Sequence, residues 1–229
     1  METRILKYDQ PEAEVSPAVA GVMTQPAGHR SPARIAGEIL RNGGIVAFPT
    51  DTVYGLGAVY SDAQAVRKIF AAKGRPENKP LSILVSGPQQ AEQLALEVSP
   101  KARKLMEAFW PGALTIIFRR NPQAGIPEEV TAGGDTIGVR MPESRAALEV
   151  IREAGAPVAA PSANRSGKRS AASARDVIED LDGRIDLIID GGSCPVGISS
   201  TVLDFTEGTI RILREGTITR AMIEEVLAQ

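Results

Sequence analysis

The chain has 229 residues, of which 43% are hydrophobic, enough to build the core of one large α/β domain or two small ones. Its 26 Lys and Arg residues against 28 Asp and Glu residues give a formal net charge of −2. This balance excludes a global positive field that would draw the protein onto nucleic acid or an anionic membrane, so an anion site must be a local cluster.

The first 30 residues are rich in Pro, Ala and small polar residues and have no clear periodicity. We expect residues 1–30 to form a partly ordered N-terminal extension. A helix should begin after Ser31, a capping residue followed by proline, and end at Asn42-Gly43. The apolar run 44–48 then predicts a buried strand that ends in a polar cluster.

The pattern from residue 54 onward alternates between strands and helices. A strand is expected at 54–60, and a helix capped by Asp62 should run to Lys73. Further strands are predicted at 81–85, 114–118, 136–140, 157–160, 185–190, 200–205 and 209–213, and further helices at 89–97, 100–109, 144–154, 173–182 and 219–228. The sequence therefore predicts one α/β domain over residues 31–229, built as a twisted, mixed open sheet with helices packed on it.

Histidine and cysteine chemistry is limited by residue counts. His29 is the only histidine, and it falls in the extension, which argues against a Ser-His-Asp triad, a Cys-His pair or a histidine metal site. Cys194 is the only cysteine, so no internal disulfide can form, and its simplest interpretation is a small buried hydrophobe. With no apolar run of about 18 residues, we expect a cytoplasmic protein without a membrane segment.

The standard nucleotide-binding motifs are incomplete. Gly167-Lys168 resembles the end of a Walker motif, but Ser162 stands where the upstream glycine is required. The glycines at 55–57 begin a dinucleotide fingerprint, but Tyr60 replaces its third glycine. Both P-loop and Rossmann sites are disfavoured.

Three polar segments fall where a strand or helix ends, the usual position of sites in α/β sheets. Segment 49–55 carries hydroxyls and one carboxylate, segment 73–80 carries three cations stiffened by prolines, and segment 159–164 carries small residues with a Ser and an Asn. Arg and Lys together suit a polyphosphate, and Ser and Asn can donate hydrogen bonds. Each segment alone is equally typical of an ordinary polar turn or a solvated basic loop. Weaker candidates are Arg140, Ser199-Ser200-Thr201 and Arg214.

Six short sequence blocks, most of which overlap these segments and candidates, follow one another along the chain in this order: PTDTVYGLG (49–57), KGRP (73–76), PGALT (111–115), VRMP (139–142), APSAN (160–164) and ISSTVLD (198–204). Taken together, they closely resemble the YrdC/TsaC threonylcarbamoyl-AMP synthase family, over roughly residues 31–220. The resemblance implies a single YrdC-like domain with a concave, basic cavity. It also implies a nucleotidyltransferase, an L-threonylcarbamoyladenylate synthase that takes ATP, L-threonine and bicarbonate and serves threonylcarbamoyl modification of a tRNA adenosine next to the anticodon.

The resemblance also implies roles for particular residues. The family's Lys-x-Arg and Ser-x-Asn tetrad falls on Lys73, Arg75, Ser162 and Asn164, as catalytic and ATP-binding residues. Contacts to threonine or carbamate fall on Thr50, Tyr54, Arg140 and Ser200. Further ATP contacts fall on Lys79, Thr136, Ser170 and Arg214. No protein metal site is implied, and Mg²⁺ is expected to bind through the ATP phosphates.

The expected reaction joins three anions in one pocket. As a hypothesis, the threonine amine captures CO₂ to give a carbamate, whose oxygen attacks the α-phosphorus of ATP and expels pyrophosphate. Cations would have to offset the repulsion, with Lys73, Arg75 and Arg214 as providers, and Arg140 could hold the threonine carboxylate. The resemblance also implies that the protein contacts tRNA and works with a downstream threonylcarbamoyl-transferase complex.

Two departures and three alternatives accompany this interpretation. Many relatives carry a His near the end of the strand that here ends in Leu84, and some carry a second C-terminal domain. One alternative is a double-stranded RNA- or tRNA-binding module that uses Arg165, Lys168 and Arg169. A YciO-like paralogue without synthase activity is another. A carbamoyl-transferring hydrogenase-maturation protein is disfavoured, because that protein is longer and carries zinc-finger cysteines.

Overall fold

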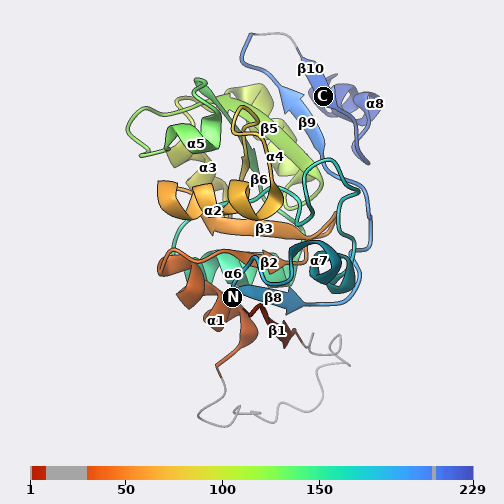
Figure 1. Cartoon of the computed structure of the whole chain (residues 1–229). Helices are drawn as coiled ribbons and strands as arrows, with labels where there is room; N and C mark the ends of the chain where they lie inside the picture. The colour runs from red at the N-terminus through yellow and green to blue at the C-terminus, as the bar shows by residue number, and fades with distance from the viewer. Residues whose placement is uncertain (1, 9–29, 208–209, 229) are drawn as a thin grey trace, which may run out of the picture.

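A computed structural model describes residues 2–8, 30–207 and 210–228 (Figure 1). Its centre is a ten-stranded sheet in the order β1-β8-β2-β3-β7-β4-β6-β5-β9-β10. Four neighbouring pairs, β1/β8, β2/β8, β4/β6 and β5/β9, are parallel, and the other five are antiparallel. The predicted mixed α/β sheet is therefore confirmed.

The strands are short, and most are buried on both faces. Their bounds are β1 Arg4–Lys7, β2 Val46–Phe48, β3 Gly55–Val59, β4 Ser82–Leu84, β5 Leu114–Arg119, β6 Thr136–Arg140, β7 Val158–Ala159, β8 Leu187–Asp190, β9 Thr201–Asp204 and β10 Arg211–Arg214. Every strand after β1 overlaps a segment where the apolar pattern predicts one, and β5 and β10 each extend one residue beyond it.

The helices begin where the sequence offers capping side chains. Ser31, Asp62 and Ser173 each accept a backbone N–H of the first turn, and Gly74 ends its helix in the left-handed conformation with φ of 59°. The bounds are α1 Pro32–Arg41, α2 Ala63–Lys73, α3 Pro88–Leu94, α4 Pro100–Phe109, α5 Glu128–Thr131, α6 Arg145–Ala154, α7 Ala174–Leu181 and α8 Arg220–Ala228. The short helix α5 is not predicted by the sequence pattern.

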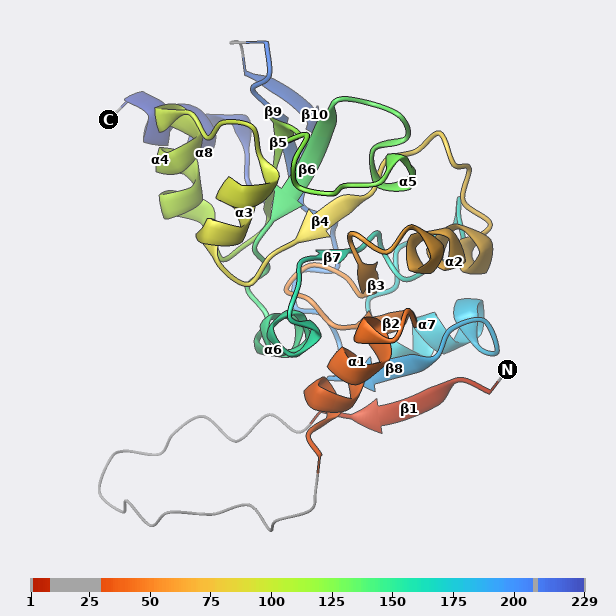
Figure 2. The ribbon, with the colours of Figure 1, turned by 90° about the vertical axis from the view of Figure 1, so that its left-hand side faces the viewer.

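Two apolar clusters pack on opposite faces of the sheet. Helices α1 and α6 pack on one face, where Leu40 and Ile151 meet Val46 and Phe48 of β2. The cluster on the other face includes Ile69 of α2, Leu105 of α4 and Ile223 of α8. Figure 2 shows α4 beside α8, away from α2. The face that carries α1 and α6 also has a cavity, which lies over β4, β6, β5 and β9. A ligand site can form in this cavity.

The N-terminal residues differ from expectation. Residues 4–7, assigned to the extension, form β1 and pair in parallel with residues 187–190 of β8. The Thr3 hydroxyl reinforces this edge, because it donates to the carbonyl oxygen of Ile185 at 2.8 Å. Most of the predicted extension, including His29, lies outside the described residues.

The part of the chain that the structure describes contains neither a membrane-spanning helix nor a metal-binding cluster. There, no helix is long and apolar enough to cross a membrane. The same residues contain no group of three or more His, Cys, Asp or Glu placed to hold a metal ion. Cys194 is buried, and burial raises the pKa of its thiol to about 11, so it is a protonated packing residue at neutral pH.

Candidate active site

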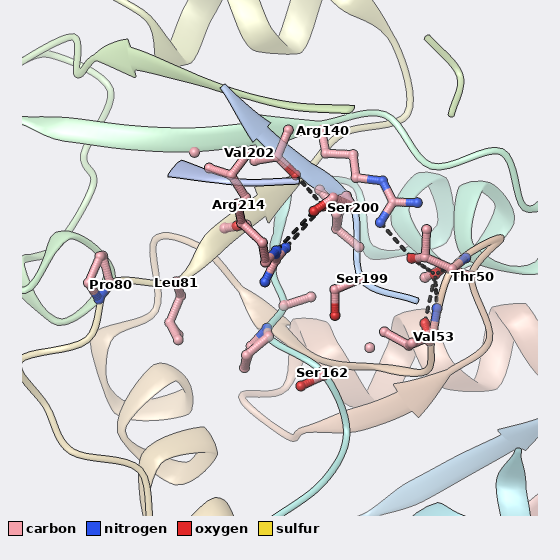
Figure 3. Close-up of a pocket in the computed structure, with 18 of the residues that line it drawn as sticks. Thr50, Val53, Pro80, Leu81, Arg140, Ser162, Ser199, Ser200, Val202 and Arg214 are labelled. Carbon is pink, nitrogen blue, oxygen red and sulfur yellow. Dashed lines mark hydrogen bonds between the residues drawn. The ribbon is translucent and has the colours of Figure 1, made fainter. Parts of the chain in front are cut away.

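A cavity of about 330 Å³ lies over β4, β6, β5 and β9 (Figure 3). Alternate residues of these strands form its floor, since Ser82 pairs with Gly138 and Gly138 pairs with Ile117. The loops after β2 and β7 form the facing wall, and the segment around Ser200 closes one side. The polar lining consists of Thr50, Thr52, Arg75, Ser82, Thr115, Arg140, Ser162, Ser199, Ser200 and Arg214.

Arg140 lies at the end of β6 with its side chain almost fully buried. Its Nε donates to Gly112 O at 2.8 Å, Nη1 to Thr52 Oγ1 at 2.8 Å and Nη2 to Asp51 Oδ1 at 2.5 Å. Burial lowers the pKa of the guanidinium, and the Asp51 carboxylate opposes that shift. One N–H on each terminal nitrogen has no hydrogen-bond partner among the described residues. The Asp51 carboxylate partly offsets the charge, and the three hydrogen bonds fix the orientation of the guanidinium.

The Thr50 hydroxyl is used within its own turn. It donates to Val53 O at 2.6 Å and accepts the backbone N–H groups of Thr52 at 3.1 Å and Val53 at 3.2 Å. Its only hydroxyl hydrogen is used in the bond to Val53 O. In the 3.0 Å hydrogen bond between Thr50 Oγ1 and Thr52 Oγ1, Thr52 must therefore be the donor. The expected hydrogen bond from Thr50 to a substrate is therefore not available; Thr50 shapes the turn instead.

Ser200 and Arg214 form a second polar group beside the first (Figure 3). Arg214 Nε donates to Ser200 O at 2.9 Å, and Nη2 donates to Ser200 Oγ at 3.3 Å. Partial burial lowers the pKa of Arg214, but no acidic partner accompanies it among the described residues. Arg214 therefore brings a largely uncompensated positive charge to the cavity, as an anion site requires.

Arg75 lines the cavity from the basic loop after α2. Its Nε donates to Lys79 O at 3.3 Å and its Nη2 to Pro80 O at 2.9 Å, so backbone carbonyls orient the guanidinium. Burial lowers its pKa, and the described residues provide it with no carboxylate. Lys79 accepts the hydrogen bond from Arg75 Nε through its carbonyl, while its side chain is exposed and outside the lining, so its expected ATP contact stays a prediction.

Lys73 lies behind the cavity wall. Its side chain is 2% exposed, and Nζ donates to Ser162 O at 2.5 Å and to Asn164 O. Burial, then repulsion from Arg75, lowers the pKa of Lys73 to about 8, with Asp180 opposing the shift. Lys73 thus fixes the loop that carries Ser162, and only Arg75 and Ser162 of the predicted tetrad line the cavity.

Asn164 and Tyr54 are also internal supports. Asn164 Nδ2 donates to Arg165 O at 2.8 Å and Lys168 O at 2.9 Å. Its Oδ1 is the one buried side-chain polar atom without a partner in the part of the chain that the structure describes. Tyr54 reaches the lining, but its hydroxyl donates to Gly192 O at 2.7 Å, and its ring is fully buried. The Tyr54 hydroxyl and the Asn164 amide nitrogen are thus engaged within the protein, and Asn164 does not line the cavity.

Two expected ATP contacts lie outside the lining. Thr136 starts β6 on the same face as Gly138 and Arg140, but beyond the cavity edge, and Ser170 is half-buried in the loop before α7. Leu84, where relatives often carry His, does line the cavity and makes that part of the floor apolar. Sequence reasoning missed the roles of Asp51, Thr52, Ser82, Thr115 and Gly138. Because alternate residues of a strand face the same side, the strand pattern could have indicated the floor residues. It could not have indicated the buried ion pair of Asp51 with Arg140.

The lining has a defined chemical character. It combines three guanidinium groups with several hydroxyls, and no carboxylate among the described residues lines it. Such a surface can hold anionic oxygens and neutralise charge that grows during a displacement. It offers no ligand set of its own for Mg²⁺, which prefers carboxylate oxygens and water.

Comparisons with known proteins agree with this geometry. A family model described as "Telomere recombination", for the Sua5/YciO/YrdC domain, matches residues 38–216. The threonylcarbamoyl-AMP synthase of Bacillus subtilis is 49% identical over 192 residues, which cover 84% of this chain and 55% of that protein. The synthase of Pyrococcus abyssi is 46% identical over 196 residues, which cover 86% of this chain and 57% of that protein. The chain thus spans little more than half the length of these two relatives.

Solved structures give the same result. The structure of P. abyssi Sua5 complexed with L-threonine superposes with a TM-score of 0.82 at 47% identity, covering 85% of this chain and 56% of that one. Escherichia coli YciO superposes with a TM-score of 0.76 over 94% of this chain and 95% of that one, but at 24% identity it supports the fold alone. On the family model and these identities, the chain belongs to the Sua5/YciO/YrdC family.

Proposed function

We propose that this chain is an L-threonylcarbamoyladenylate synthase, a nucleotidyltransferase that forms threonylcarbamoyl-AMP and pyrophosphate from L-threonine, bicarbonate and ATP. The observation that carries the proposal is the meeting of Arg75, Ser162, Ser200 and Arg214 in one cavity with the end of β6 at Arg140. The similarity to threonylcarbamoyl-AMP synthases supports it further.

The cavity geometry suggests a division of roles. Arg75 and Arg214, which lack acidic partners among the described residues, are proposed to bind the ATP phosphates together with Ser162. The two free N–H groups of Arg140 and the hydroxyl of Ser200 are proposed to bind the threonine carboxylate or carbamate. Lys73, Asn164, Thr50 and Tyr54 act indirectly, by holding the loops. The expected contacts of Lys79, Thr136 and Ser170 remain outside the proposed site.

The proposed reaction has three steps that balance. Bicarbonate first takes up one proton and loses water, which supplies CO₂. The neutral threonine amine then forms a bond from its nitrogen to the carbon of CO₂ and releases one proton, which gives the carbamate. A carbamate oxygen then bonds to the α-phosphorus of ATP while the bond between that phosphorus and the bridging oxygen breaks, releasing pyrophosphate. Catalysis would rest on positioning and on charge neutralisation by the arginines, because no side chain that lines the cavity in the described residues is an obvious general base.

Several partners belong to the same proposal. Mg²⁺ would enter on the ATP phosphates, since the lining lacks carboxylates among the described residues. The product would pass to a threonylcarbamoyl-transferase complex that modifies tRNA, and a direct tRNA contact is proposed as part of that transfer. A cytoplasmic location follows from this reaction, because its substrates and tRNA are there. We propose residues 31–229 as the catalytic domain, with β1 completing its sheet.

Calorimetric titration tests this proposal against RNA binding. The synthase should bind ATP and threonine, and RNA binding alone, falling steeply with salt, would contradict it. The suggested RNA patch is weakened by pairing, since Lys168 Nζ lies 2.5 Å from Asp180 Oδ1. Absence of ATP and threonine binding would also refute the proposal.

A further inference from the structure

Thr115 of β5 is one of the residues of the cavity floor. Its exposed fraction is 1%, and its Oγ1 lies 2.8 Å from Oγ of Ser200. No role for this residue follows from the sequence motifs, yet it is the floor residue in direct contact with the Ser200 and Arg214 group.

The methyl group of Thr115 fixes which way its hydroxyl points. A Cβ atom added at Gly138 would lie 3.2 Å from Thr115 Cγ2, so the methyl group packs over the glycine of the neighbouring strand. Threonine is β-branched and its χ1 angle is stiff, so a fixed methyl also fixes the hydroxyl. Gly138 therefore provides the space in which Thr115 can face Ser200.

The hydrogen bonds of the hydroxyl pair leave one donor unused. Thr115 and Ser200 carry one hydroxyl hydrogen each and share one hydrogen bond, while Arg214 Nη2 donates into Ser200 Oγ at 3.3 Å. Whichever hydroxyl donates to the other, the second O–H has no acceptor among the described residues. Both residues line the cavity, so this O–H is available to a ligand beside the Arg214 guanidinium.

Arg214 is held in place from its other side as well. A Cβ atom at Gly216 would meet Ser199 O at 2.5 Å, so the chain after β10 lies directly on the Ser199–Thr201 backbone. Gly216 N donates to Thr201 Oγ1 at 2.8 Å, and that hydroxyl donates to Ile218 O at 2.6 Å. The Ser199–Thr201 backbone is therefore packed against and hydrogen-bonded to the chain just after Arg214, and Thr115 contacts the Ser200 side chain.

We infer that Thr115 is a positioning residue of the site: it orients the Ser200 hydroxyl so that one O–H and the Arg214 guanidinium together bind an anionic oxygen of a substrate. The inference rests on the proposed function for the identity of that substrate. The oxygen belongs either to an ATP phosphate or to the threonine carboxylate or carbamate, which share this chemistry.

The test compares Thr115→Val, which keeps the shape and removes the hydroxyl, with Thr115→Ser, which keeps the hydroxyl and removes the methyl. Thr115→Val should weaken one substrate's KM or Kd about tenfold or more, the usual effect of losing a hydrogen bond to a charged group. Thr115→Ser should lose less, within about threefold of the parent protein, because its hydroxyl can still reach Ser200 although the methyl group no longer restricts its rotation. A change in the ATP constant identifies a phosphate, and a change in the threonine constant identifies a carboxylate or carbamate.

Two results would overturn the inference. One is an unchanged Kd for both substrates in Thr115→Val, and the other is equal loss in both variants, which would assign the effect to packing. Thermal melting of each variant shows that folding is retained, and Thr115→Ser remains informative if the valine variant is unstable. Failure of the parent protein to form the adenylate would refute the proposed function instead, and calorimetric binding of ATP and threonine would still test Thr115.

Discussion

The side-chain nitrogen of Lys73 lies 2.5 Å from the carbonyl oxygen of Ser162, behind the wall of the cavity that Ser162 lines. The buried side chain of Lys73, at the end of α2, is therefore hydrogen-bonded to the loop that carries Ser162 and Asn164. Arg75, two residues further on, lines the cavity. Two cations of one short motif thus lie in different environments: Lys73 is buried behind the wall, and Arg75 is at the cavity surface.

The buried position of Lys73 predicts a pH dependence of stability. Its folded pKa of about 8 is below the ordinary lysine value of about 10.4, so the unfolded chain binds more protons between these values. The contribution of Lys73 to the free energy of unfolding should therefore rise with pH from about 8 to about 10 and stay flat below about pH 7. Urea denaturation of the parent and Lys73→Met across this range measures it, since the methionine variant lacks the titrating group. A parent-minus-variant difference that does not change with pH would contradict the buried amine.

Arg75 should be needed for activity and not for folding. Arg75→Ala should lower kcat/KM for ATP about 100-fold or more, as expected when a donor to developing phosphate charge is lost. The melting temperature should change by about 2 °C or less, because the side chain makes only two hydrogen bonds, both to loop carbonyls. Lys79→Ala is the matched control, since Lys79 lies in the same loop with an exposed side chain outside the lining. Equal loss of activity in the two variants would argue against a specific role for Arg75.

The ion pair of Asp51 with Arg140 should show strong coupling. Asp51→Ala leaves the Arg140 guanidinium buried without its counter-charge and should reduce the free energy of unfolding by about 3–5 kcal/mol. Because Arg140→Met removes that charge, the double variant should lose less stability than the sum of the two single variants. Chemical denaturation of the three variants completes the cycle, and strict additivity would count against a buried pair.

Thr50 should act through the turn and not through substrate contact. Thr50→Ser keeps the hydroxyl that caps Val53 and should leave stability within about 1 kcal/mol, whereas Thr50→Val should cost about 1–3 kcal/mol by leaving the turn's N–H groups unpaired. Guanidinium denaturation and threonine titration together check this. A valine variant of nearly normal stability with a large loss of threonine affinity would show that the Thr50 hydroxyl contacts substrate after all.

Local signals predict most of the elements. Ser31, Asp62 and Ser173 each cap a helix at the predicted start, because capping depends on residues close in the chain. Strand β1 escapes prediction, since its four residues gain their hydrogen bonds from residues 187–190, far along the chain. The mixed pairing of the sheet likewise depends on contacts that periodicity does not contain.

The site was predicted in part. Arg75, Ser162, Arg140, Ser200 and Arg214 come together in one cavity, as the block pattern suggests. The direction of a side chain is harder to predict: Lys73 at the end of α2 points inward, and the Thr50 hydroxyl is satisfied within its turn. These outcomes depend on burial and on competing backbone acceptors, which a motif does not record. Gly138 matters only through the space it leaves for Thr115.

The central claim is that the arginine-lined cavity joins a nucleotide to a carboxylated amino acid. Mass spectrometry of purified protein incubated with ATP, L-threonine, Mg²⁺ and carbon-13 bicarbonate tests it most directly. The account predicts threonylcarbamoyl-AMP carrying the carbon-13 label, with pyrophosphate released only when threonine is present. Release of pyrophosphate without threonine, or no labelled adenylate from a folded protein that binds ATP and threonine, would contradict it.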